Sequence, residues 1–121
     1  MKRISTIVLA LVILLAGVTA AEAHARLQRA DPRAKSTLRT PPAQVRLWFT
    51  EQLEPAFSTI RVVNETGEQV DKADSQVDPK APKQLHVSLN ALPPGTYKVI
   101  WRVLSVDTHV TEGSFTFRVA Q

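Results

Sequence analysis

The chain has 121 residues, a formal net charge of +4 and no cysteine. Its length suits one domain, and the missing thiols exclude a disulfide framework, a cysteine nucleophile and a thiolate metal ligand. The basic residues are scattered and are not interleaved with aromatic residues, which argues against nucleic-acid binding.

Residues 1–23 have the three-part organisation of a secretory signal peptide. Lys2 and Arg3 carry positive charge, residues 4–16 are almost entirely apolar, and Ala21-Glu22-Ala23 provides small residues for a cleavage site. The apolar stretch is shorter than the roughly 20 residues that span a membrane. We therefore expect export, cleavage before His24 and a mature chain without a membrane span; an uncleaved N-terminal anchor is the alternative.

The mature chain alternates apolar and polar residues with the period of a β-strand. We expect strands at residues 26–30, 44–50, 58–64, 84–90, 96–104 and 114–120. Turn-forming residues separate these strands at positions 31–32, 41–42, 54–55, 64–67, 78–82 and 93–95. Short strands with regular turns predict one all-β domain over residues 24–121, a Greek-key β-sandwich or barrel.

Two of the three histidines occupy positions that suit a metal site. After cleavage, His24 would offer both its α-amine and its imidazole to one ion. Asp107 and His109 lie two residues apart after the longest predicted strand, and in extended chain such side chains point to the same side. His86 lies in the middle of a predicted strand, on the polar face, and is interpreted as a surface residue outside the site.

The chemistry of these ligands favours copper(II). One amine, two imidazoles and one carboxylate form a nitrogen and oxygen set suited to tetragonal copper(II), and the affinity order of divalent metals favours copper over nickel and zinc. We therefore predict one copper(II) ion per chain, held by His24, Asp107 and His109. The absence of cysteine excludes a blue-copper centre, and the single methionine, Met1, would be lost with the signal peptide.

Several short segments also follow one another in a distinctive order and spacing. They are 24–27, 31–32, 42–47, 49–51, 54–59, 92–97, 101–105, 107–109 and 113–117. Together they resemble the CopC/PcoC-type periplasmic copper-binding proteins over the whole mature chain. The resemblance implies a Greek-key fold of cupredoxin-like or immunoglobulin-like topology, and a copper(II) site at the positions of His24, Asp107 and His109.

The same resemblance implies a periplasmic carrier or buffer that acts in copper resistance or in copper delivery to a CopD-like inner-membrane protein. Two positions depart from the family pattern, which usually has glycine where Thr108 stands and proline where Val110 stands. We expect a changed loop geometry with the ligands retained. Glu51 stands where relatives often carry an acidic residue, and we interpret it as a partner of the N-terminal amine.

Two other functions are compatible with parts of the sequence. An immunoglobulin-like interaction module would bind no metal, and Asp107 and His109 would then be incidental. A histidine-brace copper oxidase would use His24 for oxygen chemistry. Aromatic residues make up only 6% of the chain, and a carboxylate ligand would occupy a position that oxygen needs. We therefore expect a binding protein and not an enzyme.

Overall fold

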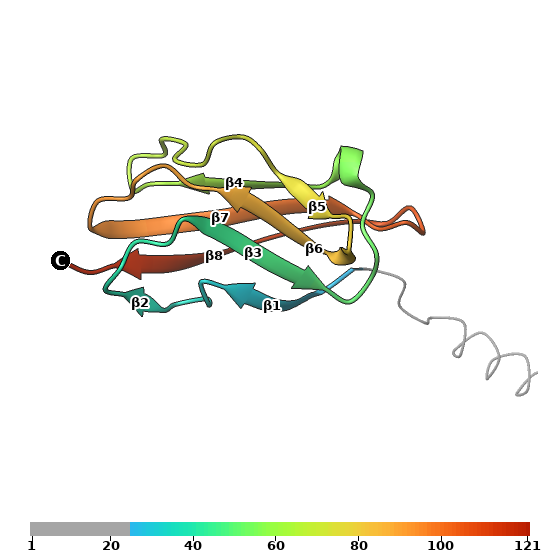
Figure 1. Cartoon of the computed structure of the whole chain (residues 1–121), viewed down its shortest axis with the longest axis horizontal. Helices are drawn as coiled ribbons and strands as arrows, with labels where there is room; N and C mark the ends of the chain where they lie inside the picture. Colours follow the sequence, from blue (N-terminus) through green and yellow to red (C-terminus); the bar gives the residue numbers. More distant parts are fainter. Residues whose placement is uncertain (1–24) are drawn as a thin grey trace, which may run out of the picture.

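The computed structural model describes residues 25–121, which form two β-sheets packed face to face (Figure 1). The predicted signal peptide and the predicted ligand His24 lie outside the described residues. The elements in chain order are β1 (Leu27–Asp31), β2 (Thr37–Leu38), β3 (Gln44–Phe49), the 3-10 helix η1 (Pro55–Phe57), β4 (Thr59–Val63), β5 (Gln76–Asp78), β6 (Ala81–Ser88), β7 (Gly95–Leu104) and β8 (Val110–Val119). No helix within residues 25–121 is long and apolar enough to cross a membrane.

Each sheet has four strands. One sheet has the order β1-β3-β6-β5 and the other the order β2-β8-β7-β4. Neighbouring strands are antiparallel except for β2, which lies parallel to β8. The predicted all-β fold is confirmed, as a sandwich: over residues 25–121 the two sheets do not join into a closed barrel.

The core consists of the apolar residues that alternate along the longer strands. Such residues share one face because successive side chains on a strand point to opposite faces. Those of β3, β6, β7 and β8 are buried between the sheets as predicted: Val45, Leu47, Phe49, Leu85, Val87, Tyr97, Val99, Val103, Phe117 and Val119. Trp48 points to the other face of its sheet, where the Arg29 guanidinium lies 4.5 Å from the ring centroid.

The structure differs from the predicted strands where hydrogen-bonded pairing with a neighbouring strand, and not an alternating apolar pattern, determines which residues form the strand. The short strands β2 and β5 have too few residues to show a periodic pattern and were not predicted. β8 begins at Val110 and not at residue 114, because its first residues pair with β7 up to the Leu104–Val110 pair. Residues 110–113 carry no alternating apolar pattern, so pairing alone extends the strand.

A close contact between β7 and β8 fills the space between the sheets. Gly113 is the cross-strand partner of Trp101, and a Cβ atom at position 113 would lie 2.2 Å from Cζ2 of the indole. The same indole contacts Phe49 of the other sheet, with ring centroids 6.3 Å apart, and Phe115, at 6.1 Å. Glycine is therefore required at position 113 for the indole to reach the opposite sheet.

Replacement of Gly113 by alanine is expected to destabilise the protein by about 1–3 kcal/mol, the usual cost of overpacking a filled core. Ser114→Ala, at the next and exposed position of β8, should change stability by less than about 0.5 kcal/mol. Trp101→Phe removes the indole atoms that the new Cβ at position 113 would meet. The double variant Gly113→Ala/Trp101→Phe should therefore lose less stability than the sum of the losses in the two single variants. Urea unfolding measures the stability of all four variants. If the losses of the two single variants at positions 101 and 113 add exactly in the double variant, the proposed clash is contradicted.

Candidate metal centre

A five-residue loop, residues 105–109, connects β7 to β8 and carries two of the three predicted ligands. Two backbone hydrogen bonds close it: the Ser105 N–H donates to the His109 carbonyl at 3.0 Å, and the Thr108 N–H donates to the Ser105 carbonyl at 2.9 Å. Because these bonds follow directly on the Leu104–Val110 pair, the loop is a tight continuation of the β7–β8 hairpin.

The loop is also anchored to residues 52–54, which belong to the connection that follows β3. We call residues 50–54 of this connection the anchoring segment. The Val106 N–H donates to the Gln52 carbonyl at 3.0 Å, and the Glu54 N–H donates to the Leu104 carbonyl at 2.8 Å. Leu53 and Ser105 form an isolated bridge between these two bonds. The backbone of the loop is therefore fixed from two sides.

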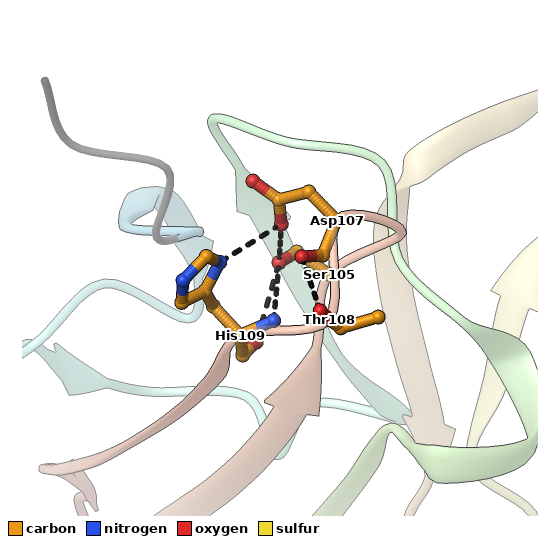
Figure 2. A network of polar contacts seen from close by, with 4 residues as sticks. All are labelled: Ser105, Asp107, Thr108 and His109. Atoms are coloured by element: carbon orange, nitrogen blue, oxygen red, sulfur yellow. Dashed lines mark hydrogen bonds and ion pairs between the residues drawn. The ribbon is translucent and has the colours of Figure 1, made fainter.

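Asp107 and His109 face one another within this loop (Figure 2). The Nδ1 atom of His109 lies 3.5 Å from Oδ1 of Asp107, and the two side chains are 44% and 40% exposed. Two atoms that bind one ion at about 2 Å each lie no more than about 4 Å apart. The observed separation therefore suits two ligands of a single ion.

The reason for this proximity differs from the one predicted. The sequence argument placed the two side chains on one side of an extended strand, but both residues belong to a turn. Between them, Thr108 has a φ of +73°, in the left-handed region that β-branched residues rarely adopt. Glycine adopts that region without steric cost, so threonine is a strained choice at this position.

Ser105 contacts both predicted ligands of the loop, and this contact was not predicted from the sequence. It is fully buried, and its hydroxyl donates a hydrogen bond to Oδ1 of Asp107, while its oxygen lies 3.4 Å from the donating His109 N–H. A serine at the end of a strand has no sequence pattern that would have predicted this contact. The hydroxyl orients the carboxylate toward His109.

This hydrogen bond also affects ionisation. The bond from Ser105, followed by the contact with His109, lowers the pKa of the Asp107 carboxyl below its ordinary value of 3.8. Hydrogen bonds to the charged form favour that form. Asp107 is therefore a carboxylate throughout the neutral range, as binding of a cation requires.

The start of the described chain is held by the same segment that anchors the loop. The Arg26 N–H donates to the Thr50 hydroxyl at 2.9 Å, and the Thr50 N–H donates to the Arg26 carbonyl at 2.9 Å. Ala25 is fully buried. Figure 1 shows this end of β1, helix η1 and the β7–β8 loop at one end of the sandwich.

The other predicted residues are placed as follows. Glu51 lies in the anchoring segment and is half-exposed, whereas His86 lies on β6 between Arg46 of β3 and Gln76 of β5. Among residues 25–121, no three histidine or carboxylate side chains gather as a complete metal site. The third predicted ligand, His24, is outside the described residues and stays a prediction.

Thr108→Gly should leave the stability of the apo protein unchanged or raise it by up to about 1 kcal/mol. The replacement relieves the left-handed strain, which costs about 1–2 kcal/mol, and offsets the greater freedom of glycine in the unfolded chain. Thr116→Gly, at an exposed position of β8, should instead destabilise by about 0.5–1 kcal/mol or more. Equal losses in denaturant unfolding would contradict the strain at Thr108.

The Asp107 carboxyl should titrate below 3.8 in the apo protein, and Ser105→Ala should move its midpoint upward. The pKa of Asp107 is lower in the folded protein than in the unfolded chain. Its ionisation therefore stabilises the fold at pH values above the unfolded-state pKa, and this stabilisation is lost as the pH falls through the folded-state pKa. Carbon-13 NMR of the carboxyl measures both midpoints. A midpoint that is the same in Ser105→Ala and in the wild type would show that the hydroxyl does not act on Asp107.

Comparison with known proteins identifies the family and the fold. Residues 27–120 match the model of the CopC domain. The chain is 37% identical over 98 residues to Protein YobA of Escherichia coli K12, covering 80% of this chain and 79% of that protein. The crystal structure of CopC from Methylosinus trichosporium OB3b is similar with a TM-score of 0.76 and 35% identity, over 80% of this chain and 94% of that one. PcoC, a methionine-rich copper resistance protein from Escherichia coli, gives a TM-score of 0.66 and 34% identity, over 80% and 99% of the respective chains. The protein is therefore a member of the CopC domain family.

Proposed function

We propose that residues 24–121 form a periplasmic copper(II) carrier or buffer, exported by a cleaved signal peptide over residues 1–23. One copper(II) ion, the cargo, is bound by His24, Asp107 and His109. The observation that carries this proposal is the facing pair of Asp107 and His109, 3.5 Å apart, at the end of the sandwich where the described chain begins.

The anchoring of Ala25 supports the inclusion of His24. Arg26 is bonded to Thr50. Two residues after Thr50, the Gln52 carbonyl accepts the hydrogen bond from the Val106 N–H of the 105–109 loop. His24 precedes Ala25 directly, and consecutive Cα atoms are only 3.8 Å apart. The amine and imidazole of a cleaved N-terminus would thus begin beside the segment that carries the loop, with Glu51 of that segment as a partner for the amine.

The donor atoms determine which oxidation state is held. Amine, imidazole and carboxylate ligands suit copper(II), whereas copper(I) prefers thiolate and thioether. The chain has no cysteine, and its one methionine is Met1. We therefore propose that copper(I) is held weakly and that reduction of the ion promotes its release.

The role is that of a carrier and not of an enzyme. Three protein residues hold the ion, and one of them is a carboxylate whose pKa is lowered by Ser105, so it remains an anionic ligand. Such a site retains copper in copper resistance or passes it to another protein. By resemblance, we propose a CopD-like inner-membrane protein as that partner.

The deciding experiment compares the protein that begins at His24 with a form carrying one added glycine before it. The addition converts the amine into an amide, which is a poor ligand, so copper(II) affinity should fall by orders of magnitude. Circular dichroism and melting of the apo form should stay the same, because the strands lie downstream. Competition with a chelator of known affinity gives the constants; equal copper(II) affinities would contradict the proposed role of the amine.

Side-chain variants of the same protein provide the controls. His109→Ala should weaken binding strongly, Asp107→Asn less so, and His86→Ala should leave the affinity unchanged. The copper-loaded protein should give a type 2 paramagnetic resonance spectrum without an intense blue band, because the ligands are nitrogen and oxygen only. Loss of binding in His86→Ala, with none in His109→Ala, would relocate the site to β6.

A further inference from the structure

The side chain of Thr111 lies just behind the 105–109 loop, on the inner face of the β7–β8 hairpin. Thr111 pairs with Val103, which is fully buried, so the threonine also faces the space between the sheets. The next pair with this orientation is Ser105 and His109, joined by the hydrogen bond from the Ser105 N–H to the His109 carbonyl at 3.0 Å. Thr111 therefore follows the predicted ligand His109 by two residues on the same face.

The hydroxyl of Thr111 is unfavourable for the apo protein. Its oxygen is buried and has no hydrogen-bond partner among residues 25–121. Such a group has lost its hydrogen bonds to water without replacing them, whereas a valine of the same shape would lose none. Buried polar groups without a partner are rare in native proteins, and each calls for an explanation. The hydroxyl therefore points to a partner that is acquired in another state of the protein.

The indole of Trp101 does not serve as that partner. Trp101 pairs with Gly113 and so lies diagonally across the hairpin from Thr111, and its Nε1 atom is likewise buried without a hydrogen bond to any residue in 25–121. The indole is held between Gly113 and Phe49, which prevents it from turning toward the hydroxyl. The side chain of His109, in contrast, is 44% exposed, so its imidazole has room to turn.

Binding of a metal changes the hydrogen bonding of the His109 imidazole. A neutral imidazole binds a metal through one nitrogen and carries its proton on the other, and that N–H takes an acceptor that fixes the ring. The Asp107 carboxylate is itself a ligand in the proposed site, and its Oδ1 already accepts a hydrogen bond from Ser105. Residues two apart on a strand are about 7 Å apart at Cα, a gap that an imidazole and a threonine hydroxyl on one face can bridge.

We propose that Thr111 is a positioning residue of the metal centre: in the copper-loaded protein its hydroxyl oxygen accepts a hydrogen bond from the His109 nitrogen that does not bind the ion. This inference rests on the proposed copper(II) site. The hydroxyl has no partner before the ion binds and gains one afterwards. It therefore lowers the stability of the apo protein and raises the affinity for copper(II), a combination that a purely structural role does not produce.

The test compares Thr111→Val with Thr111→Ser in the protein that begins at His24. Valine removes the hydroxyl and keeps the shape, so the melting temperature of the apo form should rise by about 4–8 °C, while the copper(II) affinity should fall about tenfold. Serine keeps the hydroxyl and loses a methyl group, so the melting temperature should fall, while the affinity should stay within about twofold of the wild type. Thr116→Val, at an exposed position of the same strand, should leave the affinity unchanged.

Electron spin echo modulation of the copper-loaded protein provides a readout that does not depend on stability. The nitrogen of a copper-bound imidazole that does not touch the ion modulates the echo, and its quadrupole coupling depends on the hydrogen bond that its N–H donates. Thr111→Val should change this coupling for one of the two imidazoles, and Thr111→Ser should restore it.

Separate outcomes decide between this inference and the copper site itself. A Thr111→Val protein less stable than the wild type in the apo form would overturn the inference, as would a Thr111→Val protein with wild-type affinity and modulation. Faster hydrogen exchange of the Trp101 indole N–H in apo Thr111→Val would identify Trp101 as the partner and would also overturn it. A wild-type protein that binds no copper(II) would instead overturn the proposed function.

Discussion

The hydrogen bonds made by residues 50–54 determine how the 105–109 loop and the start of the described chain lie relative to one another. Thr50 is bonded to Arg26 at the start of the described chain, and Gln52 and Glu54 are bonded to the β7–β8 hairpin. Segments that are about 80 residues apart in sequence therefore meet through one short connection. Because the connection leaves β3, whose Val45, Leu47 and Phe49 are fully buried or nearly so, the rigidity of the core extends directly to the loop. The positions of Asp107 and His109 are therefore fixed by the fold and not by a bound ion.

Within the loop, local strain and local hydrogen bonding oppose one another. Thr108 adopts a backbone conformation that is unfavourable for a β-branched residue, whereas Ser105 stabilises the same turn by bonding to the Asp107 carboxylate. The loop closes regardless because the ten-pair β7–β8 ladder brings its two ends together. Valine at position 110 takes part in the last of those pairs, so the hairpin remains regular up to His109. With Thr108 and Val110 at these positions, Asp107 and His109 face one another.

Much of the fold could be predicted from the sequence, because the strands that form the core show a clear alternation. The short strands β2 and β5 could not, since two or three residues carry no period, and the start of β8 could not, since it is defined by pairing with β7. The D-x-H spacing predicted that the side chains of Asp107 and His109 lie close together, as they do, but for the wrong reason, an extended chain where the structure has a left-handed turn. The part played by Ser105 escaped prediction because a buried serine at a strand end has no distinctive pattern, and its role depends on where the Asp107 carboxylate points.

The exposure of the site determines how it can work. Asp107 and His109 are nearly half-exposed, so neither water nor another protein's ligands are excluded from an ion held there. A deeply buried site would favour retention, whereas a shallow one allows direct exchange of ligands with an acceptor. Under the proposed function, the affinity would come from chelation by His24 and from the Asp107 carboxylate, which Ser105 holds in an oriented, ionised form. In the proposed carrier, the ease of release would therefore depend on how closely an acceptor's ligands can approach Asp107 and His109.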